Sequence, residues 1–281
     1  MNAQKPDNDR FAYHVGRINL SGLTMTKVIL WLVAITIVSF VIGFGILALS
    51  GDLSSSSDNK VSPFRHTASY RPNTTAIPLD GATTGTIRIT MGAGEVTISG
   101  NAPAPALLEA TVYSKTPEYL PEIVSSVNGT EKTVTMIEKD SGDEAWFADH
   151  SPGGWKIRLS EAVPLDLNVE LGAGDSSLDL GSLDLASLSI STGVGETEID
   201  ISRYRGRPYH AEIHNGVGDL ILRIDKNSNT RIRMHQGVGD ITTNGIEQNN
   251  EYYTTSGFDP ALPVNEITVT QGIGSVQLEA E

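Results

Sequence analysis

Residues 211–222, AEIHNGVGDLIL, decide how this chain folds, because the same pattern recurs six times along the sequence. The recurring element is Gly-x-Gly, followed in five of the six copies by an acidic residue. Counted between first glycines, the three middle steps measure 21, 23 and 21 residues. A fixed period of this size indicates a stack of structural repeats. The glycines of the six copies are Gly92, Gly94, Gly172, Gly174, Gly193, Gly195, Gly216, Gly218, Gly237, Gly239, Gly272 and Gly274.

Each copy has the pattern of two short strands joined at the glycines. Apolar residues stand five and three positions before the first glycine, as at Ala211 and Ile213, and usually six positions after it, as at Leu222. The residue between the glycines is also apolar in every copy. This alternation indicates strands with one buried face. The glycines suit a positive φ or a close approach of neighbouring chains.

The repeats predict an all-β fold, a β-solenoid-like stack of 21–23-residue units on a single N-terminal transmembrane helix. One unit cannot bury its apolar residues alone, so stacking should produce a continuous ladder of Val, Ile and Leu. An antiparallel sandwich also gives short strands at regular spacing, and it stays open as an alternative. The equal period favours the solenoid.

Two departures from the period mark additional structure. The first copy stands 80 residues before the second, and the segment between them has strand-like stretches at 107–113, 133–137 and 155–159. The last step measures 35 residues, which leaves an insertion at about 246–263. Insertions in repeat arrays often form loops on the binding face. The other interpretation is a loop that covers a sheet edge against aggregation.

The N-terminal region contains an uncharged apolar run at 28–49. Its 22 residues are enough to span a bilayer, although a cleaved signal peptide stays open as an alternative. Four Lys or Arg residues precede the run, and only Lys60 and Arg65 follow it closely, which predicts a cytoplasmic N-terminus. The predicted organisation is a cytoplasmic tail (1–27), a transmembrane helix (28–49), a stalk (50–80) and an extracytoplasmic β-repeat domain (81–281), in a bacterial cell membrane.

Composition narrows the function classes. The 281 residues carry a formal net charge of −14 and include no cysteine, so neither disulfides nor a thiolate site is available. Beyond residue 50 the sequence has 16 basic and 32 acidic residues. This excess argues against nucleic acid and anionic lipid head groups as partners. It is compatible with basic proteins, cationic peptides, divalent cations or solubility alone.

The sequence predicts no catalytic residue, cofactor or metal, and therefore no enzyme. Its Gly-x-Gly-Asp copies lack the third glycine and the βαβ context of a dinucleotide site. An edge column of carboxylates could attract Ca²⁺, or it could hydrogen-bond backbone amides. His214 and His235 hold equivalent positions and could lie on adjacent coils, either as a Zn²⁺ pair or as two surface residues. Asn215, Gln236 and Gln271 could form an amide ladder.

The run from Val163-Pro164-Leu165-Asp166-Leu167 through Gly172-Ala173-Gly174-Asp175 to Ile267–Gly274 resembles the toastrack domain. That domain occurs in LiaF-like bacterial proteins of the cell-wall-antibiotic response and in relatives described as adhesins. The resemblance implies a β-solenoid-like sensor or interaction domain at the bacterial envelope. In LiaF-like proteins it is tied to restraint of a neighbouring histidine kinase. Those proteins typically carry several membrane helices before the domain, whereas this sequence predicts one.

These observations predict a membrane-anchored extracytoplasmic interaction module, with an accessory or regulatory role in envelope-stress signalling. Its partners would be the membrane and an envelope protein such as a sensor kinase, without nucleic acid. The alternative is a cell-surface adhesin, or a glycan-binding or structural envelope protein. The candidate partner contacts lie in the 143–154 loop and in the 246–263 insertion. They are Trp146, Phe147, Tyr252, Tyr253 and Phe258.

Overall fold

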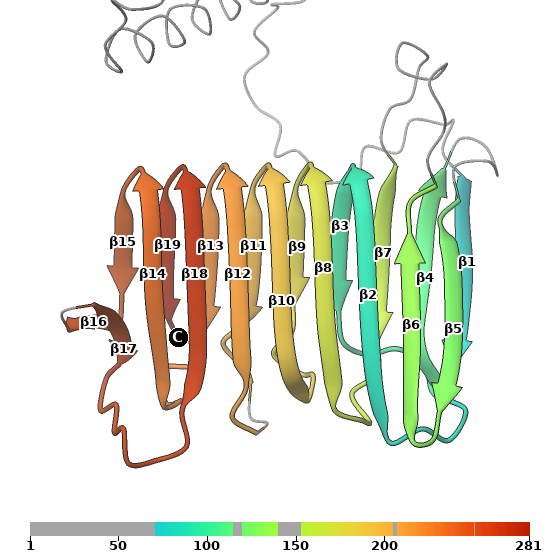
Figure 1. Ribbon diagram of the computed structural model, residues 1–281, viewed down its shortest axis with the longest axis horizontal. Helices are drawn as coiled ribbons and strands as arrows, with labels where there is room; N and C mark the ends of the chain where they lie inside the picture. Colours follow the sequence, from blue (N-terminus) through green and yellow to red (C-terminus); the bar gives the residue numbers. More distant parts are fainter. Residues whose placement is uncertain (1–70, 115–119, 140–152, 205–206, 250) are drawn as a thin grey trace, which may run out of the picture. The chain divides into compact units, whose positions relative to one another are not determined.

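The computed structural model describes residues 71–114, 120–139, 153–204, 207–249 and 251–281. They form one nine-stranded and one ten-stranded sheet (Figure 1), which confirms the all-β prediction. In spatial order the nine-stranded sheet contains β1 (Arg71–Pro78), β4 (Ala106–Ser114), β7 (Gly154–Leu159), β3 (Glu95–Ser99), β9 (Ser176–Asp179), β11 (Thr197–Ile201), β13 (Leu220–Ile224), β19 (Val276–Ala280) and β15 (Ile241–Asn244). The ten-stranded sheet contains β16 (Ile246–Asn249), β17 (Tyr252–Thr255), β14 (Thr230–Val238), β18 (Asn265–Ile273), β12 (His210–Val217), β10 (Leu185–Val194), β8 (Leu165–Ala173), β2 (Thr84–Ala93), β6 (Glu131–Ile137) and β5 (Glu122–Asn128).

Each repeat contributes one strand to each sheet, and the chain passes between the sheets at Gly-x-Gly. The unit around residue 193, for example, consists of β10 and β11. Its strands pair in parallel with those of the next unit, so that Ile190 faces Ile213 in one sheet and Ile199 faces Leu222 in the other. The first copy belongs to the same stack, because β2 pairs with β8 and β3 pairs with β9.

The stack does not follow chain order. The C-terminal unit, β18 and β19, lies between the unit of β12 and β13 and the unit of β14 and β15 (Figure 1). His214 and His235 are therefore not on adjacent coils as predicted, because each is paired with Thr270 of the strand between them. Two strand spacings put the histidine backbones about 9.5 Å apart.

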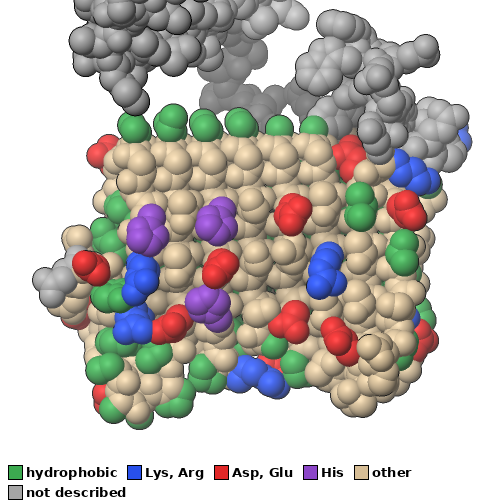
Figure 2. All heavy atoms as spheres, in the orientation of Figure 1, with side chains coloured by type: hydrophobic (Ala, Val, Ile, Leu, Met, Phe, Trp, Pro, Cys, Tyr) green, Lys and Arg blue, Asp and Glu red, His purple; other side chains and the backbone are tan. Residues whose placement is uncertain are grey.

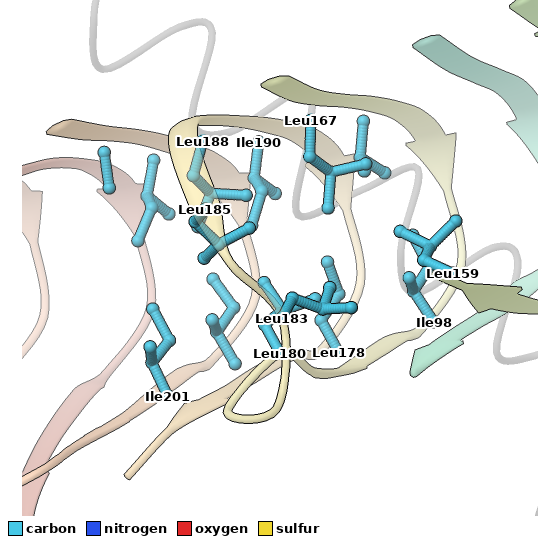
Figure 3. Close-up of a cluster of buried hydrophobic side chains, with 14 of the residues drawn as sticks. Ile98, Leu159, Leu167, Leu178, Leu180, Leu183, Leu185, Leu188, Ile190 and Ile201 are labelled. Atoms are coloured by element: carbon cyan, nitrogen blue, oxygen red, sulfur yellow. The ribbon is translucent and has the colours of Figure 1, made fainter. Parts of the chain in front are cut away.

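The core lies between the sheets and is made by the predicted alternation. Ile87, Ile190 and Leu222 have no exposed surface, and burying each such side chain stabilises the fold by about 1.5–3 kcal/mol. Leu183, on the turn between β9 and β10, is 2% exposed and joins the same cluster (Figure 3). Turn residues thus close the core at the edge opposite the Gly-x-Gly corners.

The corners depend on glycine because the backbones of neighbouring units touch there. A Cβ atom on Gly193 would lie 2.3 Å from the carbonyl oxygen of Gly172, far closer than real Cβ atoms approach. Gly195 has a φ of 144°, and a Cβ there would lie 2.0 Å from the carbonyl oxygen of Gly174. The residue between the glycines points outward, so Val194 is exposed. The sequence pattern predicted that the apolar residues between the glycines belong to the buried ladder of Val, Ile and Leu. The structure places Val194 and its equivalents outside this ladder.

The segments outside the period also form strands. The stretches at 107–113, 133–137 and 155–159 lie in β4, β6 and β7. Part of the predicted stalk is β1, which pairs with β4. The sequence pattern hides this strand because it lies at a sheet edge and its residues are largely exposed, with little apolar alternation.

The insertion at 246–263 covers the end strand of the ten-stranded sheet. Its strand β17 pairs antiparallel with β14, and β16 pairs with β17. This arrangement agrees with the edge-covering interpretation. Within the described part of the chain, no helix has the length and apolar character needed to cross a bilayer. The predicted transmembrane segment, 28–49, lies outside the described residues.

Candidate interaction surface

A hollow opens on the outer face of the ten-stranded sheet, near its β17 end. Its volume is about 140 Å³. We call it the Arg–Tyr hollow, after the two side-chain types that dominate it. Its lining residues are His210, Arg231, Arg233, Tyr252, Glu266, Ile267 and Thr268.

Strand alternation places the lining side chains on one face, except for that of Ile267, which is buried. Arg231 and Arg233 alternate with the buried Ile232 along β14, so both point outward. On one side, Arg233 faces Tyr252 of β17, and on the other it faces Thr268 of β18. The hollow therefore forms only because β17, β14, β18 and β12 lie side by side in the sheet.

The two arginines have different partners. Arg231 forms an ion pair with Glu266 of β18. Arg233 instead donates a hydrogen bond to the hydroxyl oxygen of Tyr252, and this bond is the main cause that raises the pKa of Arg233. The guanidinium carbons lie 4.9 and 5.1 Å from the centroid of the Tyr252 ring, within cation–π range. Among the described residues, Arg233 forms no ion pair with a carboxylate.

Three histidines lie on the same face (Figure 2). His210 Nε2 is 3.4 Å from Glu212 Oε1, and both side chains are more than half exposed. His214 and His235 are exposed and separated by β18. No group of three potential metal ligands occurs in the described ranges, so the geometry gives no support to a Zn²⁺ pair.

The five predicted contact residues have different positions. Tyr252 lines the hollow, whereas the neighbouring Tyr253 is 9% exposed and packs in the core. Phe258 is half-buried in the turn that follows β17. Trp146 and Phe147 lie outside the described residues. Tyr252 is thus the member of the set that the structure places in a hollow.

The sequence-based reasoning missed Arg231 and Arg233. Their signal is an Arg-x-Arg pair in the strand before Gly237, where the alternation predicts outward side chains. An outward charge on a strand usually indicates only a solvated face. The neighbouring Tyr252, which comes from a separate segment, makes this pair distinctive.

Two of the corner carboxylates, Asp175 and Asp219, accept hydrogen bonds from the backbone of the next unit. Asp175 Oδ1 accepts a hydrogen bond from the Glu196 amide at 3.0 Å, and Asp219 Oδ1 accepts one from the Ser275 amide at 2.9 Å. Burial, and then the charge of Asp175, raise the pKa of Glu95 in the first unit. Asp175 and Asp219 thus tie neighbouring units together, which agrees with the turn interpretation for these two acids.

An amide ladder runs beneath the corners. Asn215 Nδ2 donates to Gln271 Oε1 at 2.9 Å, and Gln271 Nε2 donates to the Gly218 carbonyl at 2.8 Å. Gln236 Nε2 donates to the Gly274 carbonyl at 3.2 Å. Both Asn215 and Gln271 are almost fully buried, so these bonds satisfy groups that would otherwise destabilise the core. The ladder is a structural device.

Comparisons with known proteins identify the fold. The model of a family described as the N-terminal domain of toast_rack, DUF2154, matches residues 66–223, more than half of the chain. The match ends before β14, so most of the Arg–Tyr hollow lies beyond it. No curated protein matches the chain.

Two solved structures are similar. The crystal structure of a candidate cell adhesion protein from Clostridium sporogenes ATCC 15579 is 22% identical, with a TM-score of 0.67. The alignment covers 75% of this chain and 100% of that one, and it shows a shared fold. A candidate adhesin from Bacteroides fragilis NCTC 9343 aligns at 10% identity over 75% of this chain and 98% of its own, with a TM-score of 0.32. This second likeness is too weak to support a conclusion.

Proposed function

Because the chain belongs to the toast_rack family, we propose that it is an interaction module that binds an acidic group of a protein partner in the Arg–Tyr hollow. The observation that carries the proposal is Arg233, whose exposed guanidinium hydrogen-bonds Tyr252 and forms no ion pair within the described ranges. Its remaining N–H groups can donate to a carboxylate, and such charge-assisted bonds are among the stronger hydrogen bonds.

The rest of the hollow complements an acidic group. Glu266 is already paired with Arg231, so its charge is partly neutralised. Thr268 offers a hydroxyl group beside Arg233. Tyr and Arg are the residue types that dominate binding hot spots, because they combine a flat apolar surface with directed hydrogen bonds. A cationic hollow on a protein of net charge −14 would also favour this contact over others on the surface.

We further propose the setting that the sequence indicates. Residues 28–49 would anchor the chain in a bacterial cell membrane, with the β domain outside. The module would then serve as an accessory or regulatory protein in envelope-stress signalling, with a membrane protein such as a sensor kinase as partner. Family membership and the flanking charges of the apolar run support this setting.

The proposal includes no catalytic turnover. The chain has no cysteine, and it contains neither a Gly-x-Ser-x-Gly elbow nor a His-Glu-x-x-His motif. A stack of repeats instead offers an extended rigid surface, which suits binding. In this proposal the protein acts by binding, and the side chains on its surface determine what it binds.

Adhesion is a second candidate function. It is favoured by the structural likeness to the candidate cell adhesion protein from Clostridium sporogenes. The ligand would then be an acidic glycan of the envelope, and its carboxylate or phosphate would occupy the same hollow. Both candidate functions require Arg233. They differ in the ligand that the hollow binds, which is a protein in the first and a glycan in the second.

The test is photo-crosslinking in living cells with the full-length chain. A photoreactive amino acid replaces Thr270, which lies on the same face of β18 two residues beyond Thr268, in the native background and in an Arg233→Ala variant. We expect a membrane protein to be captured in the native background and lost with Arg233→Ala. Deleting 249–262 would be a poorer test, because it removes β17 and uncovers β14.

Arg88→Ala is the matched control. Arg88 is exposed and lies on the same face and in the same row of the ten-stranded sheet as Arg233, but on β2 at the far side of the stack. Capture that survives Arg88→Ala and fails with Arg233→Ala supports the proposal. Equal capture with both variants contradicts it. Arg233-dependent retention of cell-wall glycan, with no protein captured, would favour adhesion.

A further inference from the structure

The side chains between the motif glycines form a straight exposed row along the edge where the ten-stranded sheet ends. Four of them are large and apolar, with exposed fractions of 55% for Val194, 43% for Val217, 54% for Ile273 and 66% for Val238. Figure 2 shows hydrophobic side chains aligned along this edge. We call this row the corner ridge. In spatial order it consists of Ala93, Ala173, Val194, Val217, Ile273 and Val238.

The side chains of the corner ridge cannot turn inward. Val194 stands between Gly193 and Gly195, and a Cβ at either glycine would collide with the carbonyl oxygen of the adjacent unit. The backbones are therefore in contact beneath the ridge, and no interior space is available for the apolar side chain. Neighbouring strands lie about 4.8 Å apart, so the six positions extend over about 24 Å. Exposed apolar residues are common singly, but an ordered row indicates an interaction surface.

A row of acids runs parallel to the corner ridge, two residues further along each unit. Its members lie at, or one residue before, the start of a strand of the nine-stranded sheet, where they are wholly or partly exposed. Asp175 and Asp219 each use one oxygen to accept a backbone hydrogen bond, which fixes their direction. Parallel charges at this spacing create a strongly negative potential. We call this set the acid row, and it consists of Glu95, Asp175, Glu196, Asp219 and Asp240, with Ser275 between the last two.

We propose that the corner ridge and the acid row bind a cationic amphipathic helix of a protein partner, lying along the stack. The apolar face of the helix packs on the ridge, and Lys or Arg side chains on its flank pair with the acid row. The spacing favours a helix over an extended segment. Same-face residues recur about every 5.4 Å along a helix, but about every 6.7 Å along a strand. The helical value is closer to the 4.8 Å step of the ridge.

The charge pattern also selects this occupant over two others. Anionic lipid head groups would be repelled by the acid row, as would the acid row of a second copy of this chain. Two copies would in addition bury little area along a single row of side chains. Stable protein interfaces bury about 800 Å² on each partner. A cationic helix gains from both rows at once.

This surface is independent of the Arg–Tyr hollow. The hollow lies on the outer face of the ten-stranded sheet, whereas the corner ridge follows the edge between the two sheets. The proposal therefore holds or fails separately from the proposed function. Arg233→Ala, which removes one of the two arginines that line the hollow, should leave helix binding unchanged.

The test uses the full-length chain in nanodiscs of zwitterionic lipid and a designed peptide of Leu and Lys. The peptide has about 18 residues, which gives a helix of about 27 Å, with Leu along one face. We expect it to bind, and to bind more weakly as salt screens the acid row. A triple variant, Val194→Ser, Val217→Ser and Ile273→Ser, should weaken binding by roughly 10- to 100-fold. A double variant, Glu196→Gln and Asp240→Asn, should make peptide binding less dependent on salt concentration.

Matched controls distinguish binding at the corner ridge from nonspecific hydrophobic binding elsewhere on the protein. Val124 and Val127 of β5 are 55% and 47% exposed and lie off the ridge, so their replacement by Ser should leave binding unchanged. Equal binding of a scrambled Leu–Lys peptide, or no loss in the ridge variant, overturns the proposal. A photo-crosslinker at Val217 in cells should capture a protein with a basic amphipathic segment. Capture of lipid alone, or of a second copy alone, also overturns it.

Discussion

The unit of β10 and β11 and the unit of β14 and β15 contain the same motif but differ in burial. In the first, Ile190 and Ile199 have no exposed surface. At the equivalent positions of the second, Met234 is half-buried and Thr243 is exposed. The first unit has a neighbouring unit on each side, whereas the second is the last of the stack. A repeat therefore acquires its buried core from its neighbours.

The two sheets end differently at the terminal unit. In the ten-stranded sheet, β17 and β16 continue beyond β14. In the nine-stranded sheet, β15 is the last strand of the described residues. A Thr at position 243, where other units carry Ile or Leu, suits this open end, because its hydroxyl remains in water. Side chains at equivalent positions of the motif are therefore buried or exposed according to whether another unit lies next to them.

The largest expected effect comes from adding a methyl group to a corner glycine. Gly193→Ala should destabilise the fold by about 3 kcal/mol or more, because its Cβ would lie 2.3 Å from a backbone oxygen. Gly92→Ala in the first unit should cost less than about 1 kcal/mol, since its Cβ meets only the flexible Glu138 carboxylate at 3.0 Å. Thermal unfolding of both variants measures the difference. Similar losses would show that the corners do not depend on a neighbouring unit.

A buried leucine and its exposed counterpart give the next largest difference. Leu222→Ala should reduce the free energy of unfolding by about 2–5 kcal/mol, because Leu222 has no exposed surface. Thr243→Ala, at the equivalent exposed position of the terminal unit, should change it by less than about 0.5 kcal/mol. Denaturant unfolding at equilibrium provides the values. A large loss for Thr243→Ala would mean that the nine-stranded sheet is covered at this end.

A smaller difference is expected between two corner carboxylates. Asp219 accepts a hydrogen bond from the Ser275 amide at 2.9 Å, so Asp219→Ala should destabilise by about 0.5–1.5 kcal/mol. Asp240, in the terminal unit, has no equivalent bond among the described residues, and Asp240→Ala should change stability by less than about 0.5 kcal/mol. Both variants remove one negative charge, so general charge effects are matched. Equal losses would argue against the role of the hydrogen bond.

The smallest effect concerns Glu95, in the unit at the other end of the stack. Burial, and then Asp175, raise its pKa above 4.5 in the folded state. Folded protein then keeps the proton to a higher pH than unfolded protein, so stability falls as the pH rises through the folded pKa. Glu95→Gln should therefore be slightly more stable than the native chain at about pH 7, and this advantage should disappear below about pH 4. A gain in stability of Glu95→Gln that is the same at every pH would contradict this assignment of the raised pKa.

The strands could be predicted from the sequence because their physical cause is local. Alternation places Ile213 and Leu222 on the inward faces of their strands. Stack order is not apparent from the motif alone, since every copy carries the same Gly-x-Gly corner. The position of β18 and β19 depends on the course of residues 246–263, which form the β16–β17 hairpin and the turn after it. The His214–His235 prediction failed for this reason.

The candidate surface could be predicted only in part. Adjacent strand residues point to opposite faces, so Tyr252 and Tyr253 had to differ in burial. Which of them faces outward depends on the pairing of β17 with β14, in which Tyr252 lies opposite Arg233. The outward position of Arg233 follows from alternation, but its contact with Tyr252 joins residues 19 positions apart across two strands.

The sequence by itself determined the strands of the repeats, their buried faces and the need for glycine at each corner. These features follow from a period of two and from the absence of a side chain, which are local properties of the chain. Only the tertiary structure decided the order of the units, the outward direction of Val194 and its equivalents, and the meeting of Arg233 with Tyr252. Each of these depends on which backbone lies next to which, and that choice is made by packing between segments far apart in the sequence.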